Sequence, residues 1–212
     1  MGKNKVEAAD INLSHALATC KRFHHAAAHL ACNFVGLSAD EIIDNNLKLP
    51  NLIWIGGKEL HFLSQHYKGN EILSRSNSDM ITPYLVNAAF SLELHLKTFI
   101  FLKMNIWPDQ HKLDSLFNIL PLKIREEIEV IFLYLSSFDQ KLQSQTIELM
   151  RKNRIGINWR ISELFKHSSN AFIAHRYPFE GKSTCSFIGY SDLAATLMDR
   201  INHIITTKNV KL

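Results

Sequence analysis

The spacing of apolar side chains predicts helices along most of the chain. Between residues 13 and 35 the apolar positions fall on one side of a helical wheel, which is typical of a surface helix. Residues 83–105 are apolar almost all the way round, as expected for the central helix of a bundle. Shorter helices are expected over 111–120, from Pro121 to about Asp139, and over 191–206.

The segment 158–181, NWRISELFKHSSNAFIAHRYPFEG, predicts a further helix. Asn158 is a suitable N-cap, and Pro178 disfavours helical geometry in the residue before it, so the helix should end near Tyr177. The stretch before this helix is expected to be partly helical up to Arg154.

Residues 47–80 carry mixed signals. Their apolar run LPNLIWI could pair as a short strand, a helix is expected around Lys58–Tyr67, and SRSNSD is turn material that suggests a domain boundary. The predicted fold is all-α: an up-and-down bundle of four or five helices over residues 81–212, with an N-terminal helical extension over residues 1–80.

Composition adds a few limits. The chain has 212 residues, 46% of them hydrophobic, which suffices for one buried core, and its net charge of +4 only mildly favours polyanionic partners. The N-terminus lacks the apolar run of a secretory signal, and Glu93, His95, Lys97 and Lys103 interrupt the most apolar stretch. We therefore expect a soluble cytoplasmic protein that does not insert into a membrane.

No metal or cofactor is expected. The three cysteines include no CxxC pair. His25, His29 and Cys32 share one helical face and could ligate a transition metal, but no carboxylate or fourth ligand accompanies them. A solvated polar face is the preferred interpretation.

The helix quoted above carries candidate chemistry beside its core face. Arg160 and His167 are seven residues apart, which places them within about 20° of one another and roughly 10.5 Å apart along a helix axis. Glu163 lies four residues before His167, where its carboxylate can hold the imidazole. Since Ile161 and Leu164 lie about a quarter turn away, the three polar side chains are expected at the boundary of the core.

The Arg-x6-His arrangement resembles a signature of the HEPN superfamily, a group of small all-α proteins. The stretch NAAFSLELHLKTFIFLKMN, followed by HKLDSLFNILP, is similar to a further helix of that family and the start of the next one. NAFIAHRYPFE resembles the Arg-Tyr-x-x-Glu segment of a bacterial branch. The resemblance covers about residues 80–205.

This resemblance implies an HEPN-like helical bundle that forms a homodimer and, in active members, cleaves RNA without a metal. His167 would then be the general acid or base, and Arg160 would hold the phosphate, with Glu163 beside them. Positive side chains near the site are candidates for RNA contact: Arg151, Lys152, Arg154 and Lys166. A toxin or phage-defence endoribonuclease, with an antitoxin or nucleotidyltransferase as partner, is the first hypothesis.

A non-catalytic HEPN module that binds RNA, a nucleotide or a protein partner is the alternative. Ile161 stands where toxin-type motifs often have a polar residue. A second group of residues is either structural or lines a ligand cleft: His111, Arg176, Tyr177, Glu180 and Glu93. His111 is most simply a first-turn residue near a helix cap, and Arg176, Tyr177 and Glu180 form a structural clasp at a helix end in the preferred interpretation. In the clasp, Glu180 or Glu93 would neutralise Arg176. Polar side chains of the central helix could also line a cleft between helices, although hydrogen-bonded core groups are commoner: Asn87, Ser91 and His95.

Overall fold

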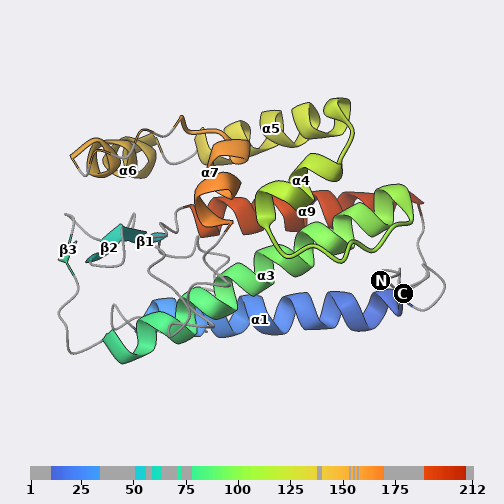
Figure 1. The fold of residues 1–212 in the computed structure, drawn as a ribbon, viewed down its shortest axis with the longest axis horizontal. Coiled ribbons are helices and arrows are strands. Elements are labelled where there is room, and N and C mark those ends of the chain that lie inside the picture. Colours follow the sequence, from blue (N-terminus) through green and yellow to red (C-terminus); the bar gives the residue numbers. More distant parts are fainter. Residues whose placement is uncertain are drawn as a thin grey trace, which may run out of the picture.

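The main body of the protein is a bundle of helices with a small antiparallel sheet beside it (Figure 1). The computed structural model describes residues 11–33, 51–55, 59–63, 71–72, 78–137, 140–152, 154, 156, 158–169 and 189–208. Within these residues, the helical bundle expected from the sequence is confirmed. The sheet is an addition to the all-α prediction.

Helix α3 (Ser78–Met104) is the centre of the bundle. Three helices pack against it: α1 (Leu13–Asn33), α4 (Leu113–Ile119) and α9 (Tyr190–Lys208). Because neighbours cover α3 on several sides, its sequence is apolar nearly all round. The helix begins five residues before the predicted start at Pro83, which lies inside it.

By length and composition, the stretch Thr82–Met104 of α3 would suffice to cross a membrane. The central helix of a soluble protein meets the same criteria, and most of this stretch is buried by the rest of the bundle. No other helix within the described ranges is both long and apolar enough. A soluble, cytoplasmic protein stays a prediction.

Helix α1 begins after Asn12, which caps it. The Oδ1 atom of Asn12 accepts hydrogen bonds from Ser14 Oγ (2.8 Å) and from the backbone N–H of His15 (2.9 Å). Further along, Ala27 and Ala31 are buried in the same core as α3. The first helix therefore belongs to the bundle, and a domain boundary at residue 80 stays a prediction.

Helix α9 starts directly after Gly189, whose φ angle of 73° lies in the left-handed region. A Cβ atom at this position would come within 3.1 Å of Leu164 Cδ1. Glycine thus lets the start of α9 lie close to α7 (Ile161–Ser168). The predicted final helix over residues 191–206 is confirmed, with small differences at its ends.

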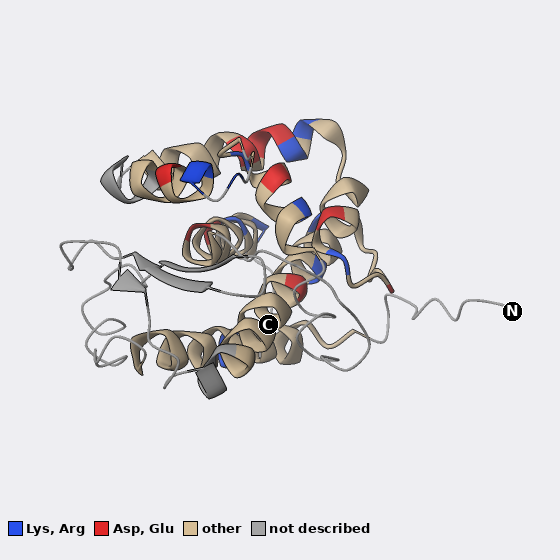
Figure 2. Ribbon diagram, turned by 60° about the vertical axis from the view of Figure 1, so that its left-hand side comes forward, with Lys and Arg blue, Asp and Glu red and all other residues tan. Residues whose placement is uncertain are grey.

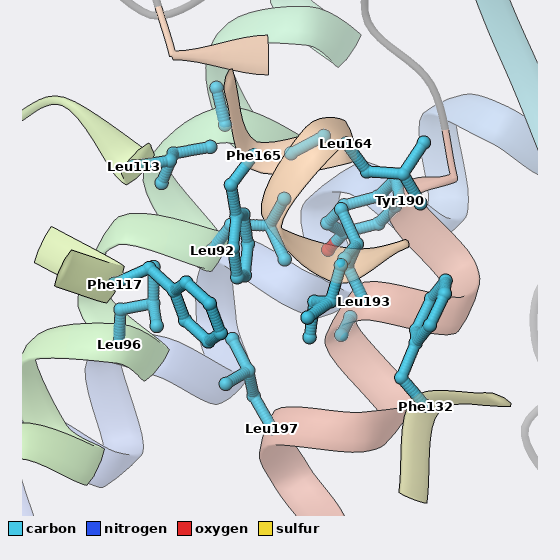
Figure 3. Close-up of a cluster of buried hydrophobic side chains, with 14 of the residues drawn as sticks. Leu92, Leu96, Leu113, Phe117, Phe132, Leu164, Phe165, Tyr190, Leu193 and Leu197 are labelled. Carbon is cyan, nitrogen blue, oxygen red and sulfur yellow. The ribbon is translucent and has the colours of Figure 1, made fainter. Parts of the chain in front are cut away.

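The remaining helices, α5 (Leu122–Ser137) and α6 (Gln140–Lys152), follow α4. The carbonyl of Pro121 accepts hydrogen bonds from the N–H groups of Ile124 (2.9 Å) and Arg125 (3.0 Å), as expected for proline at a helix start. Figure 3 shows how apolar side chains of several helices meet in the core, with the ring centroids of Phe117 and Phe165 5.3 Å apart. This contact joins α4 to α7.

The sheet has three short antiparallel strands in the order β1 (Asn51–Ile55), β2 (Glu59–Leu63) and β3 (Glu71–Ile72). The apolar run at Asn51–Ile55 does pair as a strand, as the sequence allowed. The helix predicted around Lys58–Tyr67 is wrong, because Glu59–Leu63 is β2 and pairs with β1 over its whole length. Its apolar Leu60 and Phe62 alternate with Glu59 and His61, a period that suits a strand.

Candidate functional site

The start of α7 differs from the prediction. The N-cap residue is Arg160, with an extended backbone at φ −131° and ψ 143°, rather than Asn158. No side chain of its own segment caps this helix. Glu129 of α5 does so from a distance, because its Oε1 accepts a hydrogen bond from the backbone N–H of Ile161 (3.2 Å). The helix therefore begins where a neighbouring helix supplies the carboxylate.

The charge of Glu129 interacts with that of Arg160, the predicted phosphate-binding residue. Burial raises the pKa of this carboxyl, while the backbone N–H groups of Ile161 and Ser162 and the charge of Arg160 act in the opposite direction. The carboxylate thus satisfies the positive end of α7 and lies within electrostatic reach of Arg160.

The predicted catalytic side chains have unequal access to water. Arg160 is exposed, whereas Glu163 and His167 are half-buried at the edge of the core. The buried face of α7 consists of Ile161 and Leu164 with their neighbours on the same side. Neither the guanidinium nor the imidazole is sealed against apolar neighbours, so both can meet a ligand. Arg160 lies before the first turn of α7 and has an extended backbone. The angle of about 20° that a continuous helix would place between Arg160 and His167 is therefore not found.

The pKa of His167 is lowered, so its imidazole is neutral at pH 7. Burial lowers its pKa from 6.5, the carboxylate of Glu163 raises it, and the ammonium group of Lys166 lowers it again. Glu163 is shared, since its Oε2 also lies 4.0 Å from Lys166 Nζ. The imidazole is thus able to accept a proton at pH 7.

A cleft of about 340 Å³ lies between α4 and α7. Its lining residues include two of the predicted site residues and four that sequence reasoning missed: Glu163 and Lys166; Asp114, Phe117, Asn118 and Ser162. Arg160 and His167 do not line it. The cleft carries both acidic and basic groups, so it is not a simple anion site.

Asp114 fixes the two helices at one end of this cleft. Its Oδ1 accepts a hydrogen bond from Ser169 Oγ, and its backbone N–H donates to the same hydroxyl (2.8 Å). At the other side, Arg125 Nη1 donates to Asn118 Oδ1 (3.0 Å). Asp114 and Ser169 are 55 residues apart, so no local pattern in the sequence indicates this pairing.

The predicted RNA-contacting residues at the end of α6 are exposed and partly engaged with a carboxylate. Arg151 donates two hydrogen bonds to Glu148, at 3.0 and 3.1 Å, and Lys152 Nζ lies 4.0 Å from the same carboxylate. This bond to Arg151 lowers the pKa of Glu148. Arg154 is exposed on a backbone with φ 57°. Figure 2 shows stretches of Lys and Arg next to stretches of Asp and Glu on the helices at the top of the view.

The buried carboxylate of Glu93 on α3 has two partners, one on the same helix and one just before α4. Its Oε1 lies 3.0 Å from Lys97 Nζ and 2.9 Å from His111 Nδ1, while its side chain is only 2% exposed. Its Oε2 has no hydrogen-bond partner among the residues that the structure describes. His111, which lies just before α4, therefore pairs with Glu93, whereas the clasp stays a prediction. The other predicted members lie outside the described residues: Arg176, Tyr177 and Glu180.

The described part of the chain offers no metal centre. No three His, Cys, Asp or Glu side chains within it come together in a way that could hold an ion. On α1, Cys32 is buried while His25 and His29 face outward. Cys32 therefore does not share the solvated face of His25 and His29, which corrects the expectation that all three lie on one polar face.

Comparison with known proteins assigns no family. The chain matches no family model, no curated protein and no solved structure. The helical bundle rests on the structure itself, and the resemblance to the HEPN superfamily stays a prediction.

Proposed function

We propose that this protein is an HEPN-like endoribonuclease that cleaves RNA without a metal, in the manner of toxin or phage-defence enzymes. One observation carries the proposal: Arg160 and His167 stand at opposite ends of α7, and both are accessible to a ligand. A guanidinium offers a planar fork to phosphate oxygens, and a neutral imidazole accepts a proton.

In this reaction, His167 takes the proton of a ribose 2′-hydroxyl while the 2′-oxygen attacks the adjacent phosphorus. The bond from phosphorus to the 5′-oxygen breaks, and the leaving oxygen takes up a proton. The products are a 2′,3′-cyclic phosphate and a 5′-hydroxyl, so no water, oxidant or metal enters the balance. Arg160 stabilises the negative charge that develops on the phosphate oxygens.

A second subunit would complete the site. One imidazole in one protonation state serves as base or as acid, whereas the reaction needs both roles. A homodimer brings a second His167 and a second Arg160 to the same phosphate. The exposed side chains Arg151, Lys152, Arg154 and Lys166 would then guide the RNA backbone toward it.

A non-catalytic HEPN module that binds RNA, a nucleotide or a protein is the second candidate. The position of Glu129 favours it, since its carboxylate already provides a counter-charge for Arg160 and a cap for α7. In that case Arg160 and Glu129 would hold the helix in place, and the exposed basic residues would serve binding alone.

Incubation of RNA with the purified protein in EDTA separates the two candidates. We expect cleavage by the wild type and by His203→Ala, which alters an exposed histidine on α9, and none by His167→Ala. The rate should pass through a maximum below pH 6.5, because burial lowers the pKa of His167 and the reaction needs one neutral and one protonated ring. Equal activity of all three proteins, or none in any, would reject the nuclease and favour the binding module.

A further inference from the structure

A groove runs between α1 and α9, which both pack on α3. It consists of two adjoining hollows of about 380 and 200 Å³ that share Leu17, Lys21 and Asn202 in their linings. The first volume falls within the range of about 300–1,000 Å³ that is typical of small-molecule sites. This groove lies apart from α7 and does not depend on the proposed nuclease.

The walls of the groove are mainly apolar. They consist of aliphatic and thioether side chains from both helices: Leu17, Ala18, Met198, Ile201 and Ile205. Polar groups occupy the outer parts: Ser14, Lys21, Asn202 and Thr206. With a single cationic side chain in its lining, the groove suits an apolar molecule better than a polyphosphate.

The inner hollow reaches His95 of α3, a buried histidine with one ring nitrogen engaged. Its Nδ1 lies 2.7 Å from the carbonyl oxygen of Ser91. A carbonyl only accepts hydrogen bonds, so Nδ1 carries the proton and Nε2 presents a lone pair. Nε2 has no hydrogen-bond partner among the described residues, although the side chain is only 2% exposed.

The surroundings of His95 keep this tautomer in place. Ser91, one turn earlier on α3, also lies within 3.3 Å of Nδ1 through its hydroxyl. Burial lowers the pKa of His95 to about 4, so the ring is neutral at physiological pH. His24 of α1 lies beside it, with ring centroids 6.3 Å apart, but its Nδ1 pairs with the hydroxyl of Tyr190 (2.9 Å). A neutral acceptor is thus left at the end of an apolar groove.

We propose that this groove binds a small, mainly apolar molecule that donates an O–H or N–H hydrogen bond to Nε2 of His95. Among the described residues Nε2 has no hydrogen-bond partner, and its side chain lines the inner hollow, so a ligand that brings a donor can supply one. Indole-like and phenol-like compounds combine a flat apolar body with one such donor. A carboxylate on the ligand's outer end would additionally meet Lys21.

The proposal can be tested on the full chain with two probes of the same shape. Indole carries an N–H group, whereas indene has a carbon in its place. Calorimetric titration should show indole binding about tenfold more tightly than indene, the difference expected for one hydrogen bond to a buried acceptor. Indole should also shift the Nε2 resonance of His95 in ¹⁵N spectra. Equal affinities, or no binding of either probe at millimolar concentration, would overturn the proposal.

Two matched surface variants locate the binding. Ala18→Trp fills the groove from an exposed position on α1, so it should abolish indole binding without unfolding the protein. His15→Trp places the same ring at an exposed position of α1 outside the groove and should leave binding unchanged. His95→Phe removes the acceptor and should erase the preference for indole over indene. If that variant does not fold, the comparison of probes on the wild type still decides. Indole binding that persists in Ala18→Trp would contradict the assignment.

Discussion

Polar side chains differ in solvent exposure between two regions of the molecule. Those around α6 and α7 are largely exposed, and those in the bundle interior are buried. At the end of α6, Arg151 and Glu148 pair across one helical turn, with side chains 76% and 46% exposed. On α3, Glu93 and Lys97 pair across a similar turn, but with side chains only 2% and 7% exposed. The N···O distance is 3.0 Å in both pairs, but one pair is exposed to solvent and the other is buried.

The same contrast holds for the histidines. His167 is half-buried at the edge of α7, whereas burial lowers the pKa of both His24 and His95 to about 4. A ring that reaches water can exchange its proton during a reaction. A buried neutral ring instead offers a fixed donor and acceptor. The difference separates a region suited to catalysis from one suited to recognition.

The largest effect should come from breaking the buried pair. Lys97→Met leaves the Glu93 carboxylate with His111 as its one remaining partner among the described residues, and should lower the free energy of unfolding by about 3 kcal/mol. Denaturant unfolding measures this. The double variant Glu93→Leu with Lys97→Met should recover much of the loss, since no buried charge remains. Equal losses in both variants would show that packing, not charge, dominates there.

An effect of similar or smaller size should appear on acidification. The two buried rings have pKa values of about 4 when folded and 6.5 in the reference state, so the unfolded chain binds more protons between these values. Stability should therefore be full above pH 6.5 and fall as the pH drops toward 4, because the unfolded chain then takes up protons that the folded rings refuse. His24→Gln should make this pH dependence about half as steep. An unchanged slope would mean that His24 is not held neutral.

The smallest effect on stability is expected at the exposed pair. Arg151→Met should leave the midpoint of denaturant unfolding unchanged, because both partners are well solvated and screened by salt. If RNA binds here, the slope of log affinity against log salt should decrease by about 1. A clear loss of stability would remove the contrast between surface and interior.

Most helices could be predicted because their apolar residues repeat with the helical period. This local signal correctly indicated α3 as the central helix and placed α5 and α9. It failed at Glu59–Leu63, where a five-residue strand is too short for periodicity to distinguish from a helix. Pro83 also misled, because proline is favoured in the first turn of a helix, whereas Pro83 lies inside α3, five residues after its start at Ser78.

The site was predicted only in part, because hydrogen-bond partners that are distant in the sequence produce no local sequence pattern. The polar character of Glu163 and His167 at the edge of the core followed from their spacing in the sequence. The start of α7 did not, because its cap comes from Glu129, 32 residues before Ile161. In the same way, the bond from Ser169 to Asp114 depends on how α4 and α7 pack. Pairings of this kind follow from tertiary structure.

Glu129 has a wider consequence for the molecule. The residue next to it, Val130, and Tyr134 one turn later expose large side chains on the outer surface of α5, with 67% and 63% of their area accessible. A single turn of helix thus has one side toward the solvent and the other at the base of α7. The hydrogen bond from the backbone N–H of Ile161 to Glu129 therefore fixes the start of α7, next to Arg160, to the inner side of α5.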